Sequence, residues 1–302
     1  MKRTIRRIVI FIGLVLAGAV IFFPYNQYAG DIKSMLEAQA RQRGVVLEIE
    51  QISFGFPNRI GATGIAALLP QGRIKIPLWI NSLDIAPRIW PMISGNLVAS
   101  LAGKAYAGDL SGGLDWNGPT ASGTVNLSGS DLKLELYPLF QAVGAAGTAA
   151  FSFQSGLNLL TSGNGGSQLL QPVGAKFELT VDKGSVPANR TFGPLLTIPE
   201  VSDLNLQTKL EQTEQTINVK TFKVNSSLGK VDATGTVHLT GLGQFDSARL
   251  TATIELTEAG FAAYGQQLLM MAQIQKPDPI YSWSASVDYA ARSFPNIKIV
   301  PH

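Results

Sequence analysis

The sequence predicts a mainly β protein: an N-terminal transmembrane helix, then a large curved antiparallel β-sheet or sandwich, taco-like, with two or three short helices. Three observations lead to this fold class. The chain begins with a basic and then an apolar segment, apolar residues alternate with polar ones through most of the remainder, and stretches of helical periodicity are few. Because strands and helices do not alternate, a parallel βαβ fold is excluded.

The first 23 residues combine a basic end with an uncharged apolar run over residues 8–23, and no Asp or Glu occurs before Asp31. The basic end consists of Lys2, Arg3, Arg6 and Arg7. This asymmetry is typical of a segment that inserts with its basic end in the cytoplasm. Residues 1–23 are therefore predicted to be a cytoplasmic tip and transmembrane anchor. Residues 17–19, Ala-Gly-Ala, also fit a signal-peptide cleavage site, so a cleaved segment is the alternative.

The charge of the body differs from that of the whole chain. The chain has 24 Lys and Arg against 21 Asp and Glu, but four of the basic residues and none of the acidic ones lie in residues 1–23. Residues 24–302 therefore hold 20 basic and 21 acidic residues, a net charge of −1. Nucleic-acid binding needs a basic face, so no nucleic-acid partner is expected. The absence of Cys excludes a disulfide framework and thiolate ligands.

Residues 24–44 are predicted to form an amphipathic helix directly after the anchor. Apolar side chains recur there at three- and four-residue spacing, from Tyr28 to Leu36, and Gly44 is placed to end the helix. A second helix is predicted at 258–274 and a short helical turn at 138–143. The apolar side of the 258–274 helix is expected to consist of Phe261, Tyr264, Leu268, Met271 and Ile274.

Residues 45–302 are predicted to form one β-rich domain. Strands with one apolar and one polar face are indicated by alternation of period two. The alternating segments are 45–50, 73–80, 131–136, 176–182, 204–210, 249–256 and 281–289. Between Ile217 and Phe222 the phase slips by one residue, which indicates a β-bulge near Thr221.

A weak internal repeat suggests that this domain has two repeated halves. Residues 123–129 (GTVNLSG) match residues 235–241 (GTVHLTG), and each copy is followed by a further strand pattern. The halves would join near residues 155–174, where the Gly-rich residues 163–167 are the best candidate for a flexible joint.

The predicted strands offer more apolar surface than two or three helices can cover. The sheet must then either fold on itself as a packed sandwich or leave an open groove for an apolar ligand such as lipid. The pattern leaves both alternatives open.

No residue pattern predicts catalysis, and no catalytic, cofactor-binding or metal site is expected. The chain has only two His and no Cys, so a zinc site built from them is not available. His238 falls on the polar face of a strand, without a G-x-S-x-G motif. The acidic pairs Glu48/Glu50 and Glu211/Glu214 are expected on solvated faces. We therefore expect a protein that is not an enzyme and has no cofactor.

Five features form a further pattern: the anchor ending in Phe23-Pro24-Tyr25, the step Leu68-Leu69-Pro70, the segment 85–95 with its Trp-Pro-Met-Ile-Ser-Gly end, the turn 107–112, and the strands at 235–241 and 250–256. Together they resemble the type II secretion system protein N family in its delta-proteobacterial form. The resemblance implies a single-pass inner-membrane protein with a cytoplasmic N-terminus and a periplasmic body. Its implied role is that of an accessory or scaffolding component that contacts other secretion-system proteins.

The chain also resembles the AsmA-like group of inner-membrane proteins, whose long curved sheets offer apolar grooves to lipids. This second resemblance implies lipid binding or lipid transfer as the alternative function.

Overall fold

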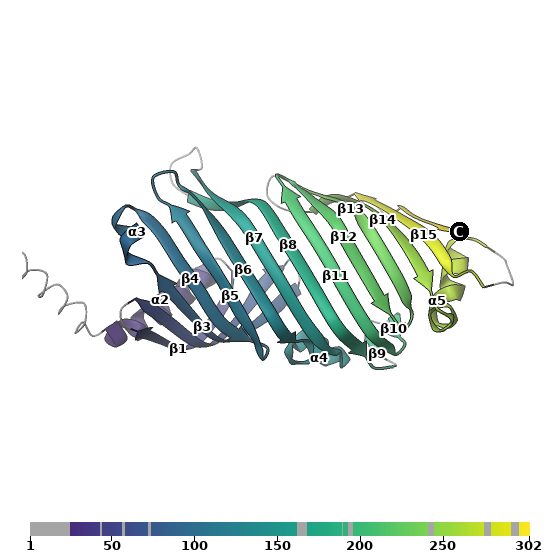
Figure 1. Cartoon of the computed structure of the whole chain (residues 1–302), viewed down its shortest axis with the longest axis horizontal. Coiled ribbons are helices and arrows are strands. Elements are labelled where there is room, and N and C mark those ends of the chain that lie inside the picture. The colour runs from purple at the N-terminus through teal and green to yellow at the C-terminus, as the bar shows by residue number, and fades with distance from the viewer. Residues whose placement is uncertain are drawn as a thin grey trace, which may run out of the picture. The chain divides into compact units, whose positions relative to one another are not determined.

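Figure 1 shows a computed structural model of the chain, which describes residues 25–42, 44–55, 58–71, 74–161, 168–188, 190–192, 196–240, 245–274, 279–290 and 296–302. The chain divides into two compact units, Met1–Ala105 and Tyr106–His302. The predicted anchor at 1–23 lies outside the described residues. Within those ranges, no helix is both long and apolar enough to span a membrane.

The first unit is a four-stranded antiparallel meander with a helix packed against its first strand. The elements are η1 (Tyr25–Tyr28), α2 (Ala29–Gln42), β1 (Val46–Gly55), β2 (Arg59–Gln71), β3 (Ile74–Pro87), α3 (Ile89–Ile93) and β4 (Asn96–Ala105). The predicted helix after the anchor is confirmed, and Gly44 ends it with a φ of 78°. Ile32 of α2 packs against a core of Ile49, Ile52 and Ile65, which joins the helix to the sheet.

The second unit is an antiparallel sheet of ten strands that neighbour one another in chain order. The strands are β5 (Gly108–Asn117), β6 (Ser122–Lys133), β7 (Ala146–Thr161), β8 (Gln168–Val186), β11 (Val201–Thr213), β12 (Thr216–Ser226), β13 (Gly229–Leu239), β14 (Phe245–Leu256), β15 (Ser282–Ala290) and β16 (Asn296–Pro301). A separate small hairpin, β9 (Arg190–Phe192) and β10 (Leu196–Ile198), lies in the connection between β8 and β11. The helices are η2 (Leu134–Leu136), α4 (Pro138–Val143) and α5 (Glu258–Met271).

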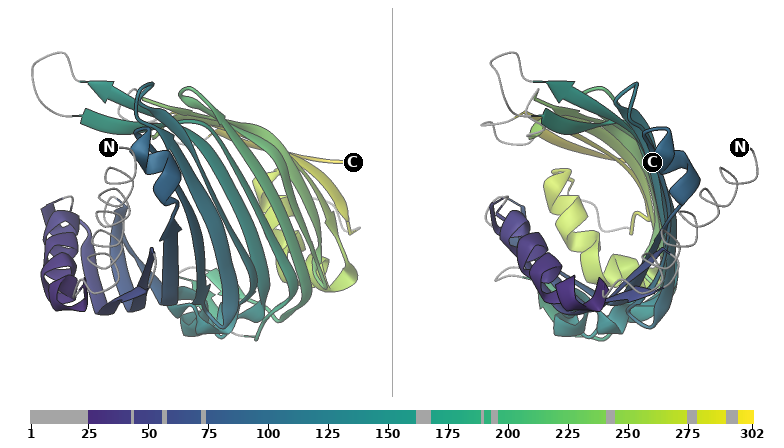
Figure 2. Two further views of the ribbon diagram at one scale, coloured as in Figure 1. Left: turned by 60° about the vertical axis from the view of Figure 1, so that its left-hand side comes forward. Right: turned by 90° about the vertical axis from the view of Figure 1, so that its left-hand side faces the viewer.

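The register of this sheet places apolar residues of successive strands side by side. Phe153 of β7 pairs with Phe177 of β8, which pairs with Leu210 of β11. Leu250 of β14 pairs with Val287 of β15 in the same way. The predicted alternation is therefore confirmed, but the main strands of each unit form one sheet and not a packed sandwich. Figure 2 shows that the sheet of the second unit is curved, with α5 on the inner side of the curve.

Three local predictions can be compared with this sheet. The bulge near Thr221 is confirmed by a register shift between Val219 and Phe222. The helices at 138–143 and 258–274 are confirmed, although α5 ends at Met271. The strand predicted over 131–136 is wrong beyond Lys133. Asp131 has a φ of 56° at an irregularity in the β6–β7 pairing, and Leu134–Leu136 forms η2 instead, leading into Pro138 at the first turn of α4.

The boundary between the two units also differs from the joint that the repeat suggested. Contacts divide the chain between Ala105 and Tyr106. The described residues of the predicted joint, within 155–174, belong to β7 and β8, which pair with each other along most of their length. Gly-rich sequence at 163–167 thus connects two neighbouring strands of one sheet.

The N-terminus of α5 is fixed to the turn between β12 and β13. The Thr257 amide donates to the Leu228 carbonyl at 3.0 Å, and the Thr257 hydroxyl donates to the Ser227 carbonyl at 2.8 Å. The same hydroxyl accepts from the Gly260 amide at 3.1 Å, as an N-cap does. A Cβ on Gly260 would lie 1.8 Å from the Leu228 oxygen, so only glycine permits this approach. These contacts set the position of α5 over the sheet.

The Thr257→Ala variant is expected to loosen the first turn of α5. The loss of the N-cap hydrogen bond costs about 1 kcal/mol, and the tie to Ser227 is lost with it. Hydrogen exchange of the α5 amides in the full chain measures the effect, with faster exchange expected in the variant. Thr257→Ser keeps the hydroxyl and should exchange like the unaltered protein. Equal exchange in the Ala and Ser variants would contradict this role of the hydroxyl.

Candidate functional site

One face of the second unit's sheet carries apolar side chains across almost its full width, and we call it the apolar face. Along its middle runs a set of residues, here named the central row, to which seven of the eight neighbouring strands from β6 to β15 each contribute one side chain. The exception is β13, which has Gly235 at this position. The central row consists of Leu127, Phe153, Phe177, Leu210, Val219, Leu250 and Val287. All of these side chains are partly exposed and none is buried. The middle of the apolar face therefore keeps part of its apolar surface accessible.

Helices cover only one margin of the apolar face among the described residues. η2 contacts β7 at one part of this margin, and α5 contacts β14 at another. The buried apolar residues of these strands follow the same margin: Ala149, Val181 and Trp283. Trp283 is fully buried, and its indole N–H donates to the Ile280 carbonyl at 2.9 Å. The side chains of the face are therefore buried at its margin and only partly buried at its middle.

A cavity of about 330 Å³ lies between α5 and the apolar face. Its volume falls at the small end of the range for ligand pockets in proteins. Burial raises the pKa of Tyr264 in its wall above the ordinary value. The apolar side chains that line the cavity are Val224, Leu228, Val231, Ile254, Leu256, Tyr264, Leu268 and Met271. The cavity extends the apolar face beneath the helix and could take the end of an apolar chain.

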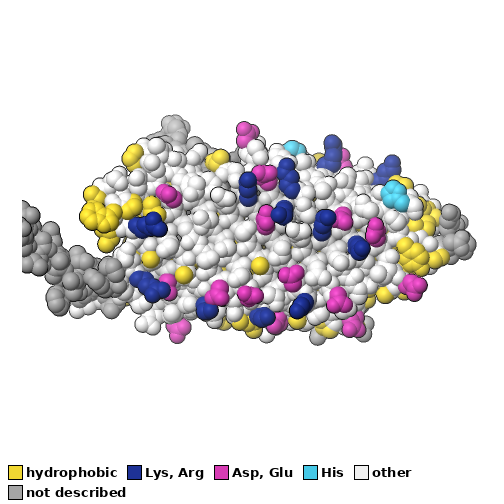
Figure 3. Space-filling view, in the orientation of Figure 1, with side chains coloured by type: hydrophobic (Ala, Val, Ile, Leu, Met, Phe, Trp, Pro, Cys, Tyr) yellow, Lys and Arg dark blue, Asp and Glu magenta, His cyan; other side chains and the backbone are white. Residues whose placement is uncertain are grey.

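The opposite face of the sheet is polar. Figure 3 shows Lys and Arg interspersed with Asp and Glu over the middle of the sheet. Cross-strand ion pairs join Lys209 to Glu178 at 3.1 Å and Arg249 to Asp288 at 3.3 Å, with all four side chains well exposed. Exposed pairs of this kind contribute little to stability. This face is suited to contact with water.

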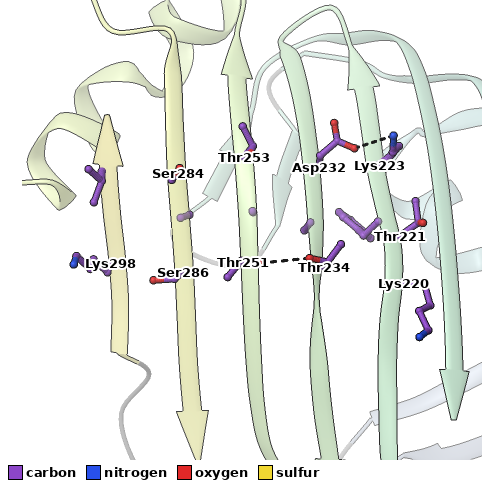
Figure 4. Close-up of a pocket in the computed structure, with 15 residues that line it drawn as sticks. Lys220, Thr221, Lys223, Asp232, Thr234, Thr251, Thr253, Ser284, Ser286 and Lys298 are labelled. Carbon is purple, nitrogen blue, oxygen red and sulfur yellow. Dashed lines mark hydrogen bonds and ion pairs between the residues drawn. The ribbon is translucent and has the colours of Figure 1, made fainter. Parts of the chain in front are cut away.

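A second cavity, of about 560 Å³, lies on the polar face over β12 to β16 (Figure 4). Thr and Ser side chains make up much of its wall. Lys223 pairs with Asp232 at 3.5 Å, and the hydroxyl oxygens of Thr234 and Thr251 are 3.5 Å apart. The charged side chains around the hollow are all exposed, so water already solvates them. It is the weaker candidate, because it holds no buried charge aimed at a ligand.

The residues weighed for catalysis lie apart from one another. His238 is exposed on β13, with its Nδ1 atom 3.1 Å from the Thr216 hydroxyl. His302, after β16, contacts the Ser284 hydroxyl. Among the residues with a described placement, no group of three or more His, Asp or Glu side chains could hold a metal ion.

The acidic pairs also lie on solvated faces. Glu48 and Glu50 are exposed on β1. Glu211 lies near two lysines, with Lys176 at 3.5 Å and Lys220 at 3.8 Å. These contacts resemble the other cross-strand pairs of the polar face and give no distinct site.

The cavity beneath α5 was not predicted from the sequence, although part of its signal was visible. Three of the five residues on the predicted apolar side of the 258–274 helix line it: Tyr264, Leu268 and Met271. Helical periodicity identifies such a stripe but does not show whether the stripe is packed or leaves space.

Comparison of the chain with models of known protein families, with curated proteins and with solved structures finds no match. Fold alone does not imply function, so the function is inferred from the chemistry of the apolar face and its cavity.

Proposed function

We propose that this protein is a membrane-anchored, non-enzymatic lipid-binding protein that holds acyl chains on the apolar face of its second unit. The central row is the observation that carries the proposal. Large apolar side chains from successive strands remain partly exposed, although burying them would be favourable. An extended exposed apolar surface marks an interaction site on a soluble domain.

The dimensions of the central row suit an acyl chain better than a compact ligand. From β6 to β15 the sheet has seven strand spacings of about 4.8 Å each, or roughly 34 Å in all. A bilayer core of about 30 Å contains two acyl chains end to end, so one chain needs about half that length. The row is long enough for a whole chain, and the cavity beneath α5 offers a place for one end.

The predicted anchor at 1–23 supports a lipid as the ligand. A segment that inserts with its basic end in the cytoplasm would hold the body at the opposite surface of the membrane, where phospholipids are the nearest source of acyl chains. The expected location is therefore the inner membrane, with a periplasmic body. The same arrangement is implied by the resemblance to AsmA-like proteins.

A second candidate is an accessory or scaffolding role in type II secretion, implied by the other resemblance. One feature favours it. β16 is the last strand of its sheet, and Ile297 and Val300 on it are 47% and 42% exposed. An exposed edge strand can accept a strand from another protein. Other secretion-system proteins would be the partners in that case.

One crosslinking experiment distinguishes the two candidates. Cells producing the full-length protein would be supplied with a phospholipid that carries a diazirine on its acyl chain, irradiated, and the purified protein examined by mass spectrometry. We expect acyl crosslinks at residues of the central row, on β7 and β8 in particular. If acyl crosslinks stay at background level and inner-membrane secretion proteins are recovered with the protein, the lipid proposal is wrong and the scaffolding role in secretion is favoured.

A further inference from the structure

The short helix α3, between β3 and β4, exposes nearly all of its apolar surface. Trp90 is 84% exposed, Ile93 74%, Met92 51% and Ile89 49%, and no residue of the helix is buried. Figure 3 shows hydrophobic side chains gathered at the position that α3 occupies in Figure 1. A cluster of this kind, in contrast to scattered single residues, indicates a surface that another apolar phase covers.

Hydrogen bonds hold α3 in this exposed position. The Arg88 amide donates to the Val98 carbonyl at 2.7 Å, which joins the two strands where α3 begins. The Ser94 hydroxyl donates to the Pro91 carbonyl at 2.8 Å. Gly95 follows with a φ of 80°, and its amide donates to the Met92 carbonyl at 3.1 Å. The apolar side chains are thus presented by a built turn at the end of two strands.

Charge near α3 favours an anionic membrane surface. Arg88 directly precedes α3, and the acidic residue before it on β3, Asp84, is paired with Arg59 of β2 at 3.1 Å. Lys and Arg near a bilayer are attracted to anionic headgroups. Trp is enriched at the membrane interface, because its ring is apolar and its N–H is polar. Trp90 beside Arg88 matches this chemistry.

The direction of α2 is the first step in locating α3 relative to the membrane. The Glu37 carboxylate accepts from the Ile49 amide at 3.0 Å, and the Lys33 ammonium reaches the Glu50 carbonyl at 3.5 Å. Earlier residues of α2 therefore lie over later residues of β1. Tyr25, the first described residue, thus belongs at the end of the sheet where β1 finishes.

β3 finishes at this same end. Gly55 of β1 pairs with Arg59 of β2, and Ile60 of β2 pairs with Ile85 of β3. The Asn58 side chain donates to the Pro87 carbonyl, directly before α3. Tyr25 and α3 therefore lie at the same end of the first unit. The apolar run at 8–23 comes directly before Tyr25 in the sequence, so it joins the unit at this end.

We propose that α3 inserts its apolar side chains into the interfacial layer of a lipid bilayer, as a second membrane contact besides the predicted anchor. The two contacts would hold the first unit in a fixed orientation on the membrane surface, which one point of attachment alone cannot do. The proposal is independent of lipid binding in the second unit, since the two use different residues in different units.

The absence of Cys allows a direct test with the full chain. Ser94→Cys, labelled with an environment-sensitive fluorophore, reports on α3 and leaves its four large apolar side chains in place. It loses the hydroxyl bond to Pro91, but the backbone amides of residues 94 and 95 keep their bonds to the Pro91 and Met92 carbonyls at 3.1 Å. Gln51→Cys, on an exposed position of β1, is the matched control. The proteins would be reconstituted in vesicles of phosphatidylcholine and phosphatidylglycerol. The label at 94 is expected to emit at shorter wavelength and to be quenched severalfold more by a lipid-borne nitroxide near the headgroup than the label at 51.

Adding Trp90→Ser and Ile93→Ser to the labelled Ser94→Cys protein is expected to return its emission to that of the control. The melting temperature should not change, because neither side chain is buried. Equal emission from the labels at 94 and 51 in the otherwise unaltered chain would overturn the proposal. So would a label at 94 that is shielded from aqueous iodide but not quenched by the lipid nitroxide, since protein would then cover α3. The result of acyl crosslinking to the central row does not depend on the outcome of this test, because the central row belongs to the second unit.

Discussion

Replacing Phe153 and Phe177 together with threonine is expected to weaken acyl crosslinking to the second unit while the sheet stays folded. The two rings pair across β7 and β8 in the middle of the central row. Both are partly exposed, so a ligand gains by covering the part of each ring that the fold leaves accessible. Threonine keeps the high β-propensity of the position and removes most of the apolar area.

The size of this effect follows from the area that the two rings offer. Full burial of one Phe side chain contributes about 1.5–3 kcal/mol. Because the fold already buries the larger part of each ring, covering the remainder contributes at most about 2 kcal/mol in all, and lipid affinity should fall by at most about thirtyfold. Crosslinking yield from the diazirine phospholipid, measured over a range of lipid concentrations, gives this ratio.

The matched control lies on the same strands. Gln154 and Lys176 pair directly beside the two rings but on the polar face. Threonine at both of these positions should leave crosslinking unchanged. Loss of crosslinking in both double variants would contradict the assignment of the ligand to the apolar face. Unfolding of the Phe153/Phe177 variant, seen by circular dichroism, would show that the central row is a closed core.

The parts of the fold that depend on side-chain period could be predicted from the sequence. Alternation at 176–182 and 249–256 identifies the strands and decides which residues share a face, because a strand has only two faces. The helix predicted at 24–44 and the bulge near Thr221 are also consequences of local pattern. The strand at 131–136 was mispredicted because alternation continues in the sequence where Asp131 takes a left-handed conformation that pattern alone does not reveal.

The candidate site could be predicted only in part. The apolar face is visible as pattern, but whether another layer covers it depends on where α5 and η2 are attached. The attachment of α5 rests on a close contact between Gly260 and the Leu228 carbonyl, residues that are distant in the sequence. The period of the apolar pattern shows on which face of the sheet a residue lies, but not whether another element packs over that face. For the same reason the Trp-Pro-Met-Ile-Ser-Gly end of segment 85–95 could be recognised in the sequence, but the exposure of Trp90 could not.

Trp283→Ala is expected to destabilise the second unit strongly, although Trp283 belongs to the same apolar face as the central row. Its side chain is fully buried, and its indole N–H has a partner in the Ile280 carbonyl. Truncation of a buried Trp to Ala typically costs about 3–5 kcal/mol, because a cavity remains. In a unit of this size, such a loss lowers the melting temperature by roughly 6–20 °C. Circular dichroism of the full chain in mild detergent measures the shift.

The melting temperatures of the Trp283 variants and of the Phe153/Phe177 variant together show which part of the apolar face is a closed core. Trp283→Phe keeps most of the apolar volume and should lose only part of the stability, since the hydrogen bond contributes about 1 kcal/mol. A melting temperature unchanged in Trp283→Ala would mean that the margin beside α5 is as open as the middle of the face. A large drop there, with little change on replacing the two Phe residues, would locate the boundary at which the core of the second unit ends and its ligand surface begins. That boundary runs along the apolar face between α5 and the central row.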